Sequence, residues 1–97
     1  MLSKKEIVKF ILQENLKKKY HLEKLGLFGS FARGEEKKDS DIDIVIEFDN
    51  VKNVQELKQG LKNILEKKFK RQVDIARERY LKSYIKTQIL SEAVYVE

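Results

Sequence analysis

The segment 41–48 (DIDIVIEF) constrains the fold of this chain more than any other stretch of its sequence. Apolar residues alternate there with mostly polar ones, and this period of two predicts a β-strand with one buried face. The remaining residues must then complete a sheet and cover that face. The two predicted faces carry Ile42, Ile44, Ile46 and Phe48 on one side and Asp41, Asp43, Val45 and Glu47 on the other.

The flanking segments predict a sheet covered by helices. Ser3 and Glu6 have the spacing of a capping box, so a helix should start there. Apolar residues at helical spacing predict two more helices, and short apolar runs predict further strands. This order predicts an α+β fold: a small mixed β-sheet with helices packed on one side. The expected elements are helices over about 3–19, 53–69 and 79–91, strands over 25–28, 41–48 and 72–76, a helical turn over 31–33 ended by Gly34, and a tail over 93–96 that forms a short strand or packs on the core.

The same periodicity places several individual side chains. Leu12 belongs to the apolar stripe expected for the first helix. Tyr80 and Tyr84 of the last helix are expected at the edge of the core rather than as residues that stack on a ligand. His21 is expected at the surface or at a helix end, and Glu47 is expected to face solvent.

Composition limits the chemistry of any bound group. The chain has no cysteine and one histidine, which excludes disulfides, thiolate zinc sites and a histidine-rich metal site. A metal would need oxygen ligands, which suits Mg²⁺ or Mn²⁺. The net charge of +5 suits a nucleotide, an acidic partner or nucleic acid. A solvated lysine-rich surface explains the same charge.

The length of 97 residues predicts a single domain, residues 1–97, close to the lower limit for an enzyme. No apolar run approaches the roughly 18 residues of a membrane span. The first residues also lack the apolar core of a signal peptide. We therefore expect a soluble, cytoplasmic protein that has no membrane partner.

A Gly29-Ser30 pair follows the strand expected at 25–28. Glycine allows a ligand to approach the backbone closely, and a turn of this kind exposes N–H groups that suit an anion. The pair is also compatible with an ordinary turn. Arg33, shortly after it, either caps that turn or contacts a phosphate group.

Three aspartates interrupt strands that are otherwise apolar. Asp41 and Asp43 point to the same face of one strand, so their charges repel unless a divalent cation binds both. Asp74 has the same position in the strand over 72–76, and it can face Asp41 and Asp43 if the two strands are neighbours. The alternative is that these carboxylates lie on the solvent-facing side of an edge strand.

Taken together, the segment GSFARGEEKKDSDID resembles the signature of the polymerase-beta-type nucleotidyltransferases. The form Gly-Ser-x-Ala-Arg-Gly followed by Ser-Asp-x-Asp resembles the minimal nucleotidyltransferase (MNT) branch of that superfamily. The likeness extends over nearly the whole chain, and it implies a nucleotidyltransferase-like fold. Its central motif is specific, whereas the flanking helices are generic.

The resemblance implies roles for six residues. Gly29 and Ser30 would hold the triphosphate of ATP, and Arg33 would support the phosphates or the turn. The three carboxylates would ligate Mg²⁺, or Mn²⁺ in its place, and act in catalysis. These are Asp41, Asp43 and Asp74, the last of which would also help to deprotonate the attacking hydroxyl.

The family further implies a separate partner, a toxin of the HEPN family. The chain would act as its antitoxin by transferring AMP from ATP to a hydroxyl, that of a tyrosine, on the toxin. Two alternatives stay open: an antitoxin that only masks its partner, and a nucleotidyltransferase for a small molecule. No helix-turn-helix or aromatic platform is evident, so no specific nucleic-acid partner is expected.

Overall fold

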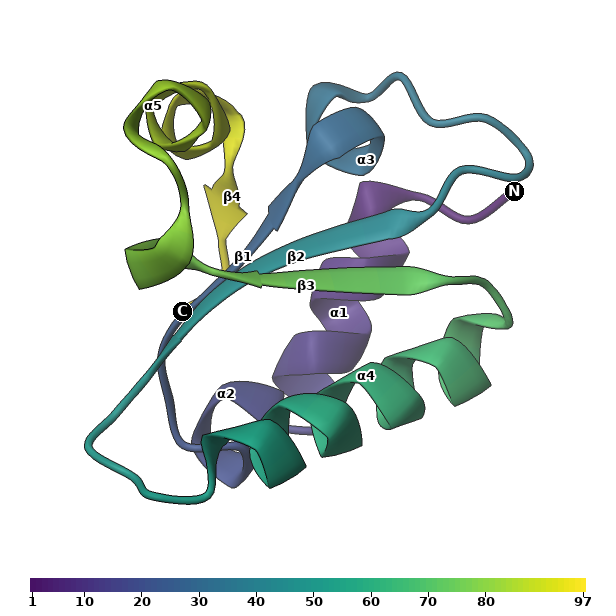
Figure 1. Cartoon of the computed structure of the whole chain (residues 1–97). Helices are drawn as coiled ribbons and strands as arrows, with labels where there is room; N and C mark the ends of the chain where they lie inside the picture. The colour runs from purple at the N-terminus through teal and green to yellow at the C-terminus, as the bar shows by residue number, and fades with distance from the viewer.

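The computed structural model describes all residues, 1–97, as one sheet with helices around it (Figure 1). No helix in it is both long and apolar enough to cross a membrane. The elements in chain order are α1 (Lys4–Gln13), α2 (Leu16–Lys19), β1 (Leu22–Phe28), α3 (Gly29–Arg33), β2 (Ile42–Phe48), α4 (Val54–Phe69), β3 (Val73–Arg77), the 3₁₀ helix η1 (Glu78–Tyr80), α5 (Ser83–Glu92) and β4 (Val94–Tyr95).

The four strands form one mixed sheet in the order β3-β2-β1-β4. Strand β1 runs antiparallel to both β2 and β4. Strands β2 and β3 are parallel, and α4 forms the crossover that a parallel pair requires. The predicted α+β fold with a mixed sheet is therefore confirmed, and the tail forms the short strand β4.

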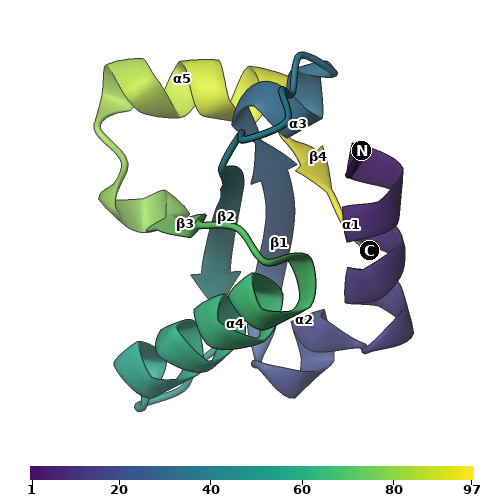
Figure 2. The ribbon, with the colours of Figure 1, turned by 90° about the vertical axis from the view of Figure 1, so that its right-hand side faces the viewer.

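Helices α1, α2 and α4 cover one face of the sheet (Figures 1 and 2). The predicted apolar face of β2 lies against them, and every one of its four side chains is buried. Burial of such side chains contributes roughly 1.5–3 kcal/mol each to folding. The core beneath these helices consists of Ile7, Ile11, Leu16, Leu22, Leu25, Leu27, Phe31, Ile42, Ile44, Ile46, Phe48, Leu61, Leu65, Val73 and Val96.

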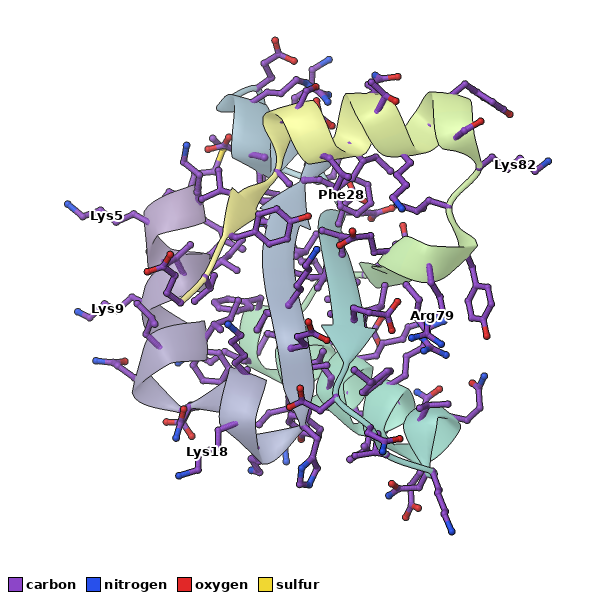
Figure 3. The ribbon with its side chains drawn as sticks, turned by 90° about the vertical axis from the view of Figure 1, so that its left-hand side faces the viewer. Lys5, Lys9, Lys18, Phe28, Arg79 and Lys82 are labelled. Carbon is purple, nitrogen blue, oxygen red and sulfur yellow. The ribbon has the colours of Figure 1, made fainter.

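The opposite face of the sheet is crossed at one end by α5, which lies above Phe28 in Figure 3. Beside it, the ring of Tyr95 lies over Gly26 and next to Val45. A Cβ at Gly26 would stand 2.9 Å from Cδ1 of Tyr95 and 3.3 Å from Cγ1 of Val45. The absence of a side chain at Gly26 therefore allows the tyrosine ring to cover the middle of this face.

The first helix is shorter than predicted, because the helical conformation is interrupted between α1 and α2. Asn15 has a positive φ of 51°, a conformation that asparagine tolerates better than most residues. The break directs Leu16 into the core, where it is fully buried. Leu12 is 53% exposed, so the prediction that it belongs to the buried stripe was wrong. The Ser3 cap is confirmed, since its hydroxyl accepts a hydrogen bond from the Glu6 N–H at 3.4 Å.

Glu47 is buried, so the prediction that it faces solvent was wrong. Two arginines near the end of β3 enclose its carboxylate. Nη2 of Arg77 donates to Oε2 at 2.9 Å, and the Arg79 N–H donates to Oε1 at 3.0 Å. Burial alone would raise the pKa of Glu47, but these hydrogen bonds and the charge of Arg77 outweigh it and lower the pKa to about 2.

The last predicted helix is divided into η1 and α5. Leu81 and Lys82 are extended between the two, which changes the faces that the helical residues present. Tyr80 and Tyr84 are 73% and 72% exposed, so the prediction that both lie at the core edge was wrong. Ile89 of α5 is buried.

Candidate active site

Helix α3 begins where β1 ends, and glycines mark both of its ends. Gly29 and Gly34 have φ values of 72°, which L side chains rarely adopt. Between them, Phe31 and Ala32 are buried and fix the short helix to the sheet. The predicted helical turn over 31–33 ended by Gly34 is thus confirmed, but the helix already begins at Gly29, so Gly29 and Ser30 form its first turn rather than a separate tight turn. The helix presents the backbone of Gly29 and the half-buried Ser30 at the end of β1.

Asp43 and Asp74 are register partners on the neighbouring parallel strands β2 and β3. Partner residues in adjacent strands point to the same face, and the strands are about 4.8 Å apart. Asp43 is partly buried and Asp74 is exposed. Asp41 lies on the exposed segment immediately before β2 rather than within the strand that was predicted to contain it.

The Gly29 turn lies directly against Asp43. Phe28 and Asp43 are register partners at the end of the antiparallel pair β1–β2. A Cβ built on Gly29 would overlap the carboxylate of Asp43 and would stand 3.3 Å from that residue's own Cβ. The structure thus places Gly29 beside Asp43, one member of the carboxylate pair.

The electrostatic environment of Asp43 is that of a carboxylate crowded by other carboxylates. Burial, followed by the charges of Asp74 and Asp41, raises its pKa to about 6. Glu92 adds to the increase, whereas Arg33 opposes it. A divalent cation bound between Asp43 and Asp74 would relieve this repulsion, because it compensates the two like charges.

Arg33 is held by two carboxylates. Its Nε donates to Oε1 of Glu35 at 2.8 Å, and its Nη1 donates to Oε2 of Glu92 at 3.0 Å. Glu92, for which the sequence predicts no role, also accepts a hydrogen bond from the Gly29 N–H. One sequence signal was available: a carboxylate in the last turn of a helix opposes the helix dipole.

The loop that leads into β2 is also held in place. The Ser40 hydroxyl accepts a hydrogen bond from the Lys37 N–H at 2.7 Å. Nη1 of Arg71 donates to the Ser40 carbonyl at 2.8 Å. These contacts position the chain immediately before Asp41.

The donors at this site match a hard divalent cation in type, since they are carboxylate oxygens. His21, the one imidazole of the chain, lies just before the start of β1, at the other end from Gly29. No three acidic or imidazole side chains stand close enough to form a complete metal site as they are. Asp41, on its exposed segment, would have to turn toward Asp43 and Asp74 to complete one.

The sequence of this chain matches known proteins over nearly its whole length. The model of the nucleotidyltransferase domain family matches residues 5–96. A protein of Thermococcus cleftensis, the protein adenylyltransferase MntA, is 34% identical over 98 residues, covering 99% of this chain and 98% of the relative.

Solved structures share the fold. A minimal nucleotidyltransferase superposes with a TM-score of 0.79 at 29% identity and covers 96% of this chain and 95% of its own. A toxin–antitoxin complex with AMP-PNP has a TM-score of 0.68 at 24% identity, with coverages of 97% and 72%. An MNT antitoxin bound to a tri-AMPylated HEPN toxin from Shewanella oneidensis has a TM-score of 0.65 at 20% identity, with coverages of 95% and 70%. The family match and the 34%-identical relative place this chain: it belongs to the nucleotidyltransferase domain family, in the branch of the minimal nucleotidyltransferases.

Proposed function

We propose that this chain is a Mg²⁺-dependent protein adenylyltransferase that transfers AMP from ATP to a tyrosine hydroxyl of a HEPN-family toxin and thereby acts as its antitoxin. One observation carries the proposal: Asp43, the strand partner of Asp74, lies directly against Gly29 at one end of the sheet. The partner is taken from the similar proteins, which include a protein adenylyltransferase and an antitoxin bound to an AMPylated HEPN toxin.

Each residue of the motif receives a role in this proposal. Gly29 and Ser30 bind the triphosphate through the turn after β1, and Arg33 adds a positive charge there. Asp43, Asp74 and the exposed Asp41 would hold Mg²⁺ through their carboxylate oxygens. When bound, Mg²⁺ compensates phosphate charge and stabilises the departing pyrophosphate.

The reaction is a displacement at the α-phosphorus of ATP. The tyrosine oxygen forms a bond to the α-phosphorus, and the bond from that phosphorus to the oxygen bridging the α- and β-phosphates breaks. Pyrophosphate leaves, and Asp74 accepts the proton of the tyrosine hydroxyl. Asp74 suits this role because it is the exposed member of the carboxylate pair, within reach of an acceptor from outside.

The proposal is tested with ATP labelled at the α-phosphate, Mg²⁺ and a HEPN-family toxin that binds this chain. We expect label on the toxin with the wild-type protein and at least about a hundredfold less with Asp43→Asn or Asp74→Asn. Asp49→Asn is the matched control, since Asp49 is an exposed aspartate just beyond the other end of β2.

Toxin neutralisation should be measured in the same variants. If Asp43→Asn binds and silences the toxin as well as the wild type does, without transferring label, then neutralisation is by masking and the enzymatic antitoxin is excluded. Label in a small-molecule fraction instead of on protein would exclude a protein acceptor.

A further inference from the structure

Glu92, the last residue of α5, accepts hydrogen bonds from two of the groups that the proposed function assigns to the nucleotide. Its Oε1 accepts from the Gly29 N–H at 3.2 Å, and its Oε2 accepts from Nη1 of Arg33 at 3.0 Å. The Glu92 side chain is 17% exposed, so the contact is shielded from solvent on most sides. One carboxylate thus bridges both donors.

The other surroundings of Glu92 are unfavourable to a negative charge. It stands at the C-terminal end of a helix, where the partial charge of the peptide dipoles is negative. It also lies close enough to Asp43 to contribute to the raised pKa of that carboxyl. Gly29 and Arg33 are therefore the contacts that hold the Glu92 carboxylate in this position.

A phosphate oxygen and a carboxylate oxygen are alternative acceptors for the same N–H group. One backbone N–H directed at Glu92 cannot donate fully to a phosphate, and an added phosphate would bring further negative charge against Glu92 and Asp43. Binding of an anion at these donors therefore requires Glu92 to withdraw.

We propose that Glu92 is an internal competitor of the nucleotide triphosphate and sets the affinity of this site for ATP. This inference rests on the proposed function, because it uses the same two donors. Glu92 is followed directly by β4, whose Tyr95 covers Gly26 of β1. Withdrawal of Glu92 therefore links occupancy of the site to the position of the C-terminal segment 83–96.

The test is the affinity for AMP-PNP with Mg²⁺, measured by isothermal titration calorimetry. Glu92→Gln should lower the Kd about three- to tenfold, the effect of removing one charge-assisted competing hydrogen bond. Glu35→Gln is the matched control: it removes the same charge from the same arginine, but the Glu35 side chain is 67% exposed and its carboxylate accepts a hydrogen bond from Arg33 rather than from Gly29. Its Kd should stay within about twofold of the wild type.

A second readout follows the Gly29 amide by NMR. Glu92→Gln should shift the Gly29 amide resonance in the nucleotide-free protein, while the remaining spectrum shows that the fold is intact. Glu92→Asp, which keeps the charge but shortens the side chain, should lower the Kd by a smaller factor because it cannot reach both donors at once.

The outcomes separate this inference from the proposed function. If the wild type transfers label to the toxin but Glu92→Gln binds AMP-PNP with equal or lower affinity, the competitor role is wrong, and lower affinity would mean that Glu92 supports the site. If neither protein binds AMP-PNP and none transfers label, both proposals fail. Tighter binding by Glu92→Gln supports the competitor role whether or not the acceptor is a protein.

Discussion

Gly29 and Asp43 are in contact across the end of the β1–β2 pair, and the contact exists because Gly29 has no side chain. A Cβ there would overlap the Asp43 carboxylate, and the φ of 72° at Gly29 is one that other residues rarely adopt. The glycine of the motif therefore has two structural requirements. It allows the chain to turn out of β1, and it leaves room for the carboxylate that adjoins it.

Replacement of this glycine should damage both stability and the site. Gly29→Ala should lower the free energy of unfolding by about 2–4 kcal/mol, the sum of backbone strain and overlap with Asp43. Label transfer should fall by at least about a hundredfold, because Asp43 is displaced. Chemical denaturation and the α-labelled ATP assay measure the two effects.

Gly34→Ala provides the control. Gly34 has the same φ of 72°, but a Cβ there would meet nothing within 4 Å. Gly34→Ala should lower the free energy of unfolding by the backbone strain alone, about 1–2 kcal/mol. The variant should keep its transfer activity. Equal losses in both variants would show that the contact with Asp43 is unimportant.

The raised pKa of Asp43 depends on its strand partner. Asp74→Asn should lower that pKa from about 6, but not to the ordinary value of 3.8, because burial is the largest cause. Asp41→Asn should lower this pKa by less, since the charge of Asp41 raises it less than the charge of Asp74 does. NMR titration of the Asp43 carboxyl carbon in metal-free protein measures both shifts. A larger effect from Asp41→Asn would contradict the pairing of Asp43 with Asp74.

Glu47 should make the folded state sensitive to acid. Its pKa in the folded state is about 2, below the ordinary 4.5. A lowered pKa stabilises the folded protein fully above pH 4.5, and this stabilisation is lost as the pH falls from 4.5 through 2. Glu47→Gln should lower the free energy of unfolding by about 2–4 kcal/mol at neutral pH, because it removes the charge that two arginines enclose.

Comparison with a more exposed ion pair tests this explanation. Glu78→Gln breaks the pair with Lys24, whose side chain is 48% exposed, and should cost at most about 1 kcal/mol. Urea unfolding at several pH values measures the free energy of unfolding. Between pH 4.5 and 2 this free energy should fall more steeply with decreasing pH in the wild type than in Glu47→Gln. Similar slopes in the two proteins would mean that Glu47 does not titrate as expected.

The end of α4 offers a stabilising change. Lys70 caps this helix with a φ of 54°, a conformation that glycine adopts without steric cost. Lys70→Gly should therefore raise the free energy of unfolding by about 0.5–1 kcal/mol. Lys67→Gly, inside the same helix and exposed, should lower it by about 1 kcal/mol. Thermal unfolding of both variants measures the two effects. If the melting temperature shifts in the same direction in both variants, the prediction is wrong.

The pattern of residues alone determined the strands, the sheet class and the grouping of the motif residues. Alternation over 42–48 is a local property of the backbone, so the buried face of β2 follows from its sequence. The helical turn ended by Gly34 follows equally from local chemistry, because glycine at a helix end relieves backbone strain.

Contacts between segments distant in the sequence were decided only by the tertiary structure. Glu47 is buried because β3 places Arg77 next to β2, which periodicity cannot reveal when both faces of a strand are covered. Glu92 reaches Gly29 across 63 positions because α5 returns over the end of β1. Such contacts depend on how helices and strands pack, and the free energy that selects the packing is shared among many residues. The sequence therefore determined which side chains form the candidate site, and the fold determined which charges surround them.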